Sequence, residues 1–196
     1  MHISEGVLSP EILSAGWVIT APAVAFIAYK LKVENIPKVA CMSAIFFIAS
    51  FIHMPVGVSS VHLILGGLIG AVLGIDAILA IFIGLLLQGV FFGFGGITIL
   101  GVNTVVIAFP AILGAVFVKL WREGKLGANV AFALSGAVPI VISTLLVDLV
   151  LFISGKEFYT IITLISLESA VLAVLEGIIT LFALKFIVRV KKEILL

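Results

Sequence analysis

The residues best suited to chemistry in this chain are its first two, Met1 and His2, and a later histidine, His62. A free amino-terminus followed by histidine offers three neighbouring nitrogen donors: the Met1 amine, the His2 backbone nitrogen and the His2 imidazole. One further imidazole would complete a square of four nitrogen ligands. Planar coordination by nitrogen suits Cu(II) or Ni(II), and imidazole is a general ligand for such metals. These residues therefore predict a site that captures a transition metal ion.

The predicted site requires an intact amino-terminus. The first 12 residues contain Glu5, Pro10 and Glu11 and lack the basic region of a secretory signal peptide, so we expect them to be retained. We also expect Met1 to stay attached, because a residue as large as His2 in second position normally blocks its removal. Loss of Met1 would destroy the chelate.

Composition places these donors in a membrane protein. Of the 196 residues, 63% are hydrophobic and only 11% are charged, and the mean hydropathy is +1.44, whereas soluble domains have about 25% charged residues. A bilayer core takes about 20 apolar helical residues to cross, so six or seven spans would occupy nearly the whole chain. A net charge of +1 without a dense basic tract argues against nucleic-acid binding. The single cysteine, Cys41, excludes an internal disulfide and a cysteine-clustered metal site.

Apolar runs separated by charged or glycine- and proline-rich segments predict seven transmembrane helices. They cover approximately residues 13–29, 39–54, 61–74, 75–92, 98–120, 129–153 and 160–187. The expected fold class is therefore all-α, a polytopic membrane bundle that forms one integral domain over residues 1–196. Its parts are an amino-terminal metal-binding segment (1–12), the transmembrane bundle (13–187) and a cytoplasmic tail (188–196).

The basic residues indicate an orientation, because Lys and Arg accumulate on cytoplasmic loops. With seven spans and an extracytoplasmic amino-terminus, ten of the eleven basic residues lie on the cytoplasmic side, and only Lys156 lies outside. The same topology places Met1, His2 and the loop before His62 together outside. The metal hypothesis plays no part in choosing that topology, so the coincidence is independent support.

Two motifs carry a resemblance to a known family. The first is the opening Met1-His2-Ile3-Ser4-Glu5-Gly6 with Leu8-Ser9-Pro10, and the second is Pro55-Val56-Gly57-Val58-Ser59-Ser60-Val61-His62-Leu63. Both resemble the substrate-binding subunit of cobalt/nickel energy-coupling-factor (ECF) ABC transporters of the cobalamin-biosynthesis and nickel-uptake type. Length and span count match over nearly the whole chain.

The resemblance implies that the Met1 amine, the His2 amide nitrogen and side chain, and His62 coordinate the metal. It implies an amino-terminus inserted toward the bundle centre, in a prokaryotic multi-pass protein of the cell membrane that captures Ni²⁺ or Co²⁺ for ATP-driven uptake. The implied partners are a transmembrane coupling (T) subunit, ABC ATPase subunits and a small auxiliary membrane subunit. No cofactor is expected besides the transported metal. Ser4 and Val7 depart from the family pattern, which affects the packing of the segment more than its donors.

His62 is predicted to be a neutral imidazole. If Val61 begins a helix, Ser59 or Ser60 caps it, and the positive end of that helix disfavours imidazolium. Competition from protons for the metal site would then fall.

A metal-bound histidine normally donates its other ring nitrogen to a nearby acceptor. For His62 the candidate acceptors are Asn103, Gln88, Ser59 and Ser60. We interpret His53, nine residues before His62, as a residue that supports the ligands or lies on the path of the incoming metal, rather than as a ligand.

Three acidic residues, Asp148, Glu168 and Glu176, lie inside predicted spans. A charged residue near the bilayer centre costs about 2.5 to 3.5 kcal/mol on insertion scales, so these side chains must face protein. Glu168 and Glu176 are eight residues apart and share a helical face. They would belong either to a proton or cation pathway or, as we favour, to the structure as hydrogen-bonded acids. Glu176 is the better candidate for an internal packing contact.

Small residues spaced by four allow helices to approach closely. This spacing occurs at Ala21 and Ala25 in the first span and at Gly66, Gly70 and Gly74 in the third. The family resemblance implies docking on the coupling subunit through small-residue faces of the first spans, so Ala21 and Ala25 are a candidate docking site.

Enzyme signatures are missing from the sequence. It contains no G-x-x-x-x-G-K-[ST] phosphate loop, no G-x-S-x-G elbow and no H-E-x-x-H zinc motif. We therefore expect a transport subunit without its own ATPase, which depends on partner ATPases for energy. The alternative is a self-sufficient secondary cation transporter or channel that uses the intramembrane acids. The Met1-His2 chelate favours the capture subunit, because a pore would not need it.

Overall fold

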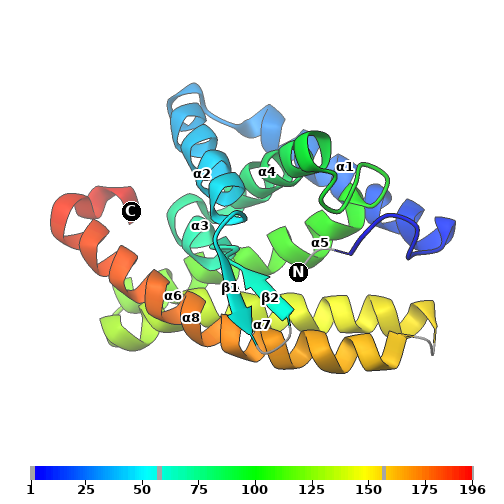
Figure 1. Cartoon of the computed structure of the whole chain (residues 1–196). Coiled ribbons are helices and arrows are strands. Elements are labelled where there is room, and N and C mark those ends of the chain that lie inside the picture. The colour runs from blue at the N-terminus through cyan, green and yellow to red at the C-terminus, as the bar shows by residue number, and fades with distance from the viewer. Residues whose placement is uncertain (1–2, 57–58, 156–157, 196) are drawn as a thin grey trace.

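A computed structural model describes residues 3–56, 59–155 and 158–195, and for residues 53–56 and 59–61 only the backbone is considered. The chain forms a helical bundle with one short β-hairpin (Figure 1). The helices are α1 (Pro10–Lys30), α2 (Ile36–Ala49), α3 (Gly66–Leu73), α4 (Ala77–Phe92), α5 (Leu100–Ala111), α6 (Leu113–Arg122), α7 (Ala128–Ser154) and α8 (Tyr159–Lys191). The strands are β1 (His53–Val56) and β2 (Ser59–His62), and 3₁₀ turns occur at η1 (Val33–Asn35), η2 (Gly74–Asp76) and η4 (Lys192–Leu195). The predicted all-α membrane bundle is confirmed, with the hairpin as an addition.

Five helical segments in the described part of the chain are long and apolar enough to cross a membrane. They are Pro10–Lys30, Gly66–Phe92, Leu100–Arg122, Ala128–Ser154 and Tyr159–Leu195. At 1.5 Å per residue, the 21 residues of α1 reach about 30 Å, the thickness of a bilayer core. The 14 residues of α2 and the 8 residues of α3 do not. The multi-pass membrane protein is therefore confirmed, whereas the count of seven spans is not.

The hairpin replaces helix that the sequence predicted. The second span was expected to end at residue 54 and the third to begin at residue 61, but α2 ends at Ala49 and α3 begins only at Gly66. Pro55 cannot donate a helical hydrogen bond, and the β-branched residues around it favour extended backbone. The two strands pair antiparallel, and their register sets His53 opposite His62.

This pairing also overturns a local prediction about His62. Ser59, Ser60 and Val61 all lie in strand β2, so neither serine caps a helix that begins at Val61. The helix dipole invoked for His62 is therefore absent at that position, and α3 starts four residues further on.

The predicted boundary between the third and fourth spans coincides with a break in the helix. Gly74 has φ 59° and ψ −127°, and η2 separates α3 from α4 there. Gly74 and Asp76 line a cavity of about 320 Å³ together with Lys119 and Arg122 from the end of α6. One end of the bundle therefore brings together the α3–α4 turn and basic residues of α6.

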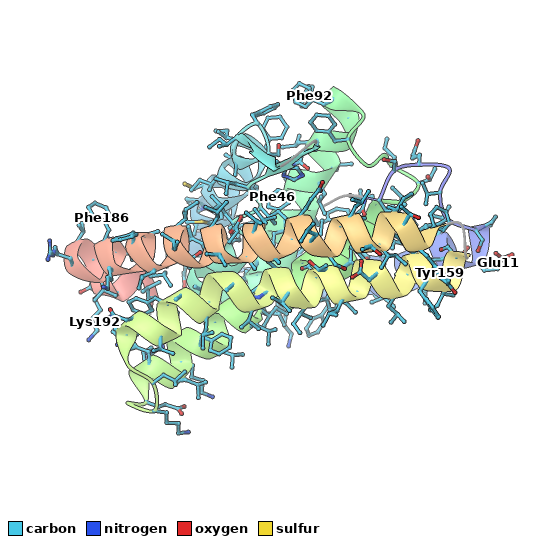
Figure 2. The ribbon with its side chains drawn as sticks, turned by 60° about the horizontal axis from the view of Figure 1, so that its bottom comes forward. Glu11, Phe46, Phe92, Tyr159, Phe186 and Lys192 are labelled. Carbon is cyan, nitrogen blue, oxygen red and sulfur yellow. The ribbon has the colours of Figure 1, made fainter. Side chains whose placement is uncertain are left out.

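The long helices define the axis of the molecule. Helices α7 and α8 lie side by side (Figures 1 and 2). Figure 2 places Glu11 and Tyr159, at the beginnings of α1 and α8, at one end of the molecule, and Phe186 and Lys192, near the end of α8, at the other. The start of α1 therefore lies at the end opposite to the carboxy-terminal basic residues.

Glycines bring α3 into close contact with its neighbours. A Cβ atom at Gly67 would collide with the Ser135 carbonyl of α7, and one at Gly70 with the Ala111 carbonyl of α5. Gly70 thus confirms the predicted close packing, whereas Gly74 ends the helix and has no atom of another residue near its Cβ position.

Candidate metal centre

The amino-terminal arm, residues 3–8, is held along its backbone by α5. The Ile3 N–H donates to Asn103 Oδ1 (3.1 Å), and Asn103 Nδ2 donates to the Ile3 carbonyl (3.0 Å). Both residues are buried, with 4% and 2% of their surface exposed. One side-chain amide therefore satisfies both backbone groups of the residue that follows His2, and it fixes the path of the chain at that point.

A second set of contacts ties the arm to the loop between α4 and α5. The Glu5 N–H donates to the Gly95 carbonyl (2.9 Å), and Glu5 Oε1 accepts from the Thr98 N–H (2.9 Å) and hydroxyl (3.0 Å). These Thr98 donors lower the pKa of the exposed Glu5 carboxyl below its ordinary value. Gly96 has φ +115°, and a Cβ atom there would collide with the Glu5 side chain. The loop is therefore shaped to receive Glu5.

Helix α1 positions the same loop and the start of α5. Trp17 Nε1 donates to the Thr98 carbonyl (2.9 Å), and the Thr20 hydroxyl donates to the Gly101 carbonyl (2.7 Å). A Cβ atom at Gly101 would lie only 2.8 Å from the Trp17 backbone nitrogen. Close packing of α1 against α5 thus helps to position the helix that carries Asn103.

His62 is partly buried at the end of β2, and its Nδ1 lies 3.1 Å from the Leu63 carbonyl oxygen. A carbonyl can only accept a hydrogen bond, so Nδ1 donates. In a neutral ring this hydrogen bond places the lone pair on Nε2, the nitrogen that could then ligate a metal. The acceptor is Leu63, while Asn103, one of the predicted acceptors, bonds Ile3. Gln88, another, is fully buried and has no hydrogen-bond partner within the described part of the chain.

Residues 62–65, here called the joint, connect the hairpin to α3 and are held by α8. Glu176 Oε1 accepts from the Ile64 N–H (2.6 Å) and the Leu65 N–H (2.8 Å), and the Glu176 side chain is fully buried. Leu65 has φ +55°, and no other non-glycine residue in the described ranges has a positive φ. Left-handed backbone costs an L-residue about 1 to 2 kcal/mol. The internal contact predicted for Glu176 is confirmed, whereas its backbone partners were not foreseen.

The two other intramembrane acids lie nearer the outer surface of the bundle. Asp148 Oδ2 accepts a hydrogen bond from the Ser166 hydroxyl (2.8 Å), which links α7 to α8. Both Asp148 and Glu168 are half-buried. A hydrogen bond between neighbouring helices agrees with the structural role favoured for Asp148.

Several predicted site residues stay predictions. Met1 and His2 lie outside the described residues, and the side chains of His53, Ser59 and Ser60 are not described. Among the residues that are described, no group of three or more His, Cys, Asp or Glu side chains would hold a metal. Ala21 and Ala25 are both exposed on α1, the least buried of the five candidate spans.

A family model decides which proteins this chain is related to. The model for CbiM, described as the cobalt uptake substrate-specific transmembrane region, matches residues 2–194. The chain belongs to the CbiM family. It is thus a membrane component of cobalt transport of the CbiM type.

Similar proteins come from several prokaryotes. A Haemophilus influenzae protein named for metal transport is 34% identical over 205 residues, which cover 100% of this chain and 97% of that protein. A Methanocorpusculum labreanum protein named for cobalt transport, CbiM 2, is 33% identical and is covered to 92% by the whole of this chain. The fused nickel transport protein NikMN of Rhodobacter capsulatus is 30% identical over 69% of this chain and 42% of its own length. The expected prokaryotic, multi-pass membrane protein is confirmed.

Two solved structures share the fold. A crystal structure of a transition metal transporter has a TM-score of 0.85 with 24% identity, over 98% of this chain and 94% of that chain. A truncated transition metal transporter has a TM-score of 0.83, also with 24% identity, over 96% and 99% of the two chains.

Proposed function

We propose that this chain is the substrate-specific subunit of an ECF-type ABC importer, and that it captures Ni²⁺ or Co²⁺ on the extracytoplasmic side of the membrane. The Met1 amine, the His2 backbone nitrogen, the His2 imidazole and the His62 imidazole are the proposed donors. The observation that carries this proposal is the hold of Asn103 on both backbone groups of Ile3. A chelating amino-terminus requires its backbone to be fixed, and the buried side-chain amide of Asn103 fixes the backbone of the residue next to His2.

The chemistry of the described residues supports this donor set. Ile3, Leu63 and Ile64 belong to one apolar core cluster, so the arm and the joint share an interior. The Nδ1 hydrogen bond of His62 to the Leu63 carbonyl orients the ring, and in the neutral form it places the lone pair on Nε2, the proposed donor atom. We propose that these two segments, far apart in the sequence, bring nitrogen donors to one site, the arrangement expected for Ni(II) in a planar field.

Energy for uptake is proposed to come from partner proteins. The chain has no phosphate-binding loop of its own. We propose a transmembrane coupling subunit that docks on the exposed face of α1 around Ala21 and Ala25, a pair of ABC ATPase subunits, and a small auxiliary membrane subunit. The end of the bundle that carries Lys119 and Arg122 is the proposed cytoplasmic side.

Hydrogen bonds made by two of the intramembrane acids weaken the alternative of a secondary cation carrier or channel. Glu176 accepts hydrogen bonds from two backbone N–H groups, and Asp148 accepts one from Ser166. Acids that serve the structure in this way are poorly suited to exchange ions during transport. A carrier would nevertheless move metal without ATPases, which makes the two hypotheses separable.

Binding of Ni²⁺ and Co²⁺ to the purified chain with its native amino-terminus tests the proposed site. One residue added before Met1 moves the amine away from the His2 amide, so we expect binding to fall at least 100-fold. His62→Ala removes the fourth donor and should weaken binding comparably, whereas His53→Ala, opposite it in the hairpin, is the matched control and should change affinity far less. Equal binding by the extended chain would show that the terminal chelate is wrong.

Two further measurements test the chemistry and the energy source. Binding through a deprotonated His2 amide releases a proton, so affinity should rise with pH, and a pH-independent affinity would indicate ordinary imidazole ligation instead. In vesicles, ⁶³Ni uptake should require the coupling subunit and ATPases together with ATP. Uptake by this chain alone would favour the secondary carrier.

A further inference from the structure

We propose that Glu176 is a positioning residue for the metal ligand His62, and that its carboxyl group sets the metal affinity of the site through the joint. This inference rests on the proposed function, because it takes His62 as a ligand. It assigns to an intramembrane acid a role that needs neither metal contact nor proton transport.

The residues that Glu176 binds lie close to His62 along the chain. Glu176 Oε1 accepts from the N–H groups of Ile64 and Leu65, at 2.6 and 2.8 Å. These are the second and third residues after His62, and consecutive Cα atoms are only 3.8 Å apart. The residue between, Leu63, accepts the hydrogen bond from His62 Nδ1. The imidazole is therefore oriented by the carbonyl of the Leu63–Ile64 peptide, and the N–H of that same peptide donates to Glu176.

Glu176 maintains an unusual backbone conformation in the joint. Leu65 adopts left-handed backbone at φ +55°, which a leucine rarely does unless its surroundings impose it. Ile64 is buried, so without an acceptor its N–H would be left unpaired in the interior. Removing the carboxyl group would therefore let the joint relax toward ordinary extended backbone. That rotation would turn Leu63 and move the His62 ring away from the other donors.

Glu176 is itself held rigidly. It is fully buried in the middle of α8, and strand β2 contacts the same helix. Its backbone carbonyl lies so close to Gly136 of α7 that a Cβ atom there would collide with it. Every hydrogen bond that the carboxylate makes in the described part of the chain goes to the joint, and its second oxygen has no partner there. The acid is thus dedicated to this segment.

Nickel affinity of the full-length chain tests the role. Glu176→Ala should lower Ni²⁺ affinity about 10- to 100-fold, the usual loss when a group that orients a metal ligand is removed. Glu176→Gln keeps an oxygen acceptor and should restore most of that loss, to within about tenfold of wild type. Glu168→Ala, on the same helix two turns nearer its start, is the matched control and should bind as wild type does.

A double-mutant cycle separates positioning from general damage to the fold. In a His62→Ala background, where the residual chelate is followed at higher nickel concentrations, Glu176→Gln or Glu176→Ala should cause no further loss. The same fold loss in both backgrounds would overturn the proposal, as would wild-type affinity of Glu176→Ala. Should Glu176→Ala not fold, the Gln variant decides: its deficit must be measurable with His62 present and vanish with His62→Ala. Absence of nickel binding by the wild-type chain would instead overturn the proposed function.

Discussion

The arm and the joint flank the proposed metal centre, and they are held by different means. The arm makes two hydrogen bonds with the neutral amide of Asn103, one donated and one accepted by Ile3, and three more through Glu5, whose side chain is exposed. The joint is held by one fully buried carboxyl group and keeps Leu65 in left-handed backbone. Hydrogen bonds contribute about 0.5 to 1.5 kcal/mol each. The arm is therefore held by the number of its hydrogen bonds, and the joint by the burial of the carboxyl group that it bonds.

This difference predicts separable behaviour. The arm is bonded at a chain end, so it can be loosened without disturbing the bundle. The joint leads directly into α3, whose glycines contact α5 and α7, so its geometry is tied to the whole fold. Variants of the arm should therefore change metal affinity with little change in the temperature of thermal unfolding.

Loss of the Asn103 amide should have the largest effect on metal affinity of the arm variants. Asn103→Ala removes both hydrogen bonds to Ile3, and we expect Ni²⁺ affinity to fall about 10- to 100-fold by titration calorimetry. Thr104→Ala is the matched control, because the buried Thr104 hydroxyl bonds the Leu100 carbonyl within its own helix. Wild-type affinity of Asn103→Ala would mean that the arm does not need this hold.

A smaller loss is expected from Gly96→Ala. The new Cβ atom would collide with the Glu5 side chain at a backbone φ of +115°, so the arm must shift, and we expect about a tenfold loss of Ni²⁺ affinity from roughly 1.4 kcal/mol of strain. Gly93→Ala is the control: its φ is also positive, at +67°, but its Cβ position is open. Equal losses in both variants would show that loop strain, and not Glu5, is responsible.

The sequence offered candidate donors but little of the structure around them. Met1, His2 and His62 were predicted from residue type and from the family resemblance, because nitrogen ligands are a property of side chains and of a chain end. The hold of Asn103 on Ile3 joins residues 100 positions apart, and nothing in the local pattern indicates it. Its polar side chain within an apolar span was the only available signal.

The hairpin was missed for a related reason. Apolar runs before and after Pro55 resemble helices in composition, and short apolar runs do not distinguish strand from helix. Pro55 and the neighbouring valines were the signal that could have indicated extended backbone. The left-handed Leu65 had no such signal, because it is imposed by Glu176 from a distant helix.

Acid should loosen the hydrogen bonds between Glu5 and Thr98. Thr98 lowers the Glu5 pKa, so the hold on Glu5 is complete above the ordinary pKa of a glutamate and is lost as the pH falls through the lower pKa of the folded chain. In metal-free protein, hydrogen exchange at the Thr98 amide should therefore accelerate on acidification relative to a reference amide such as Asn103. Glu5→Gln should remove this pH dependence, and a dependence that survives in Glu5→Gln would assign it to another group.

Leucine at both Ala21 and Ala25 should leave the site intact. Both alanines are exposed on α1, whereas Thr20, which bonds the Gly101 carbonyl of α5, is buried, so we expect Ni²⁺ affinity to be unchanged. ATP-driven uptake with the coupling subunit should nevertheless fall strongly, because larger side chains would keep two helices from approaching closely. Ala170→Leu, at an exposed position of α8, is the control and should transport normally. Normal uptake by the double variant would remove α1 as the docking face, whereas reduced metal binding would show that the arm and the outer face of α1 are not independent.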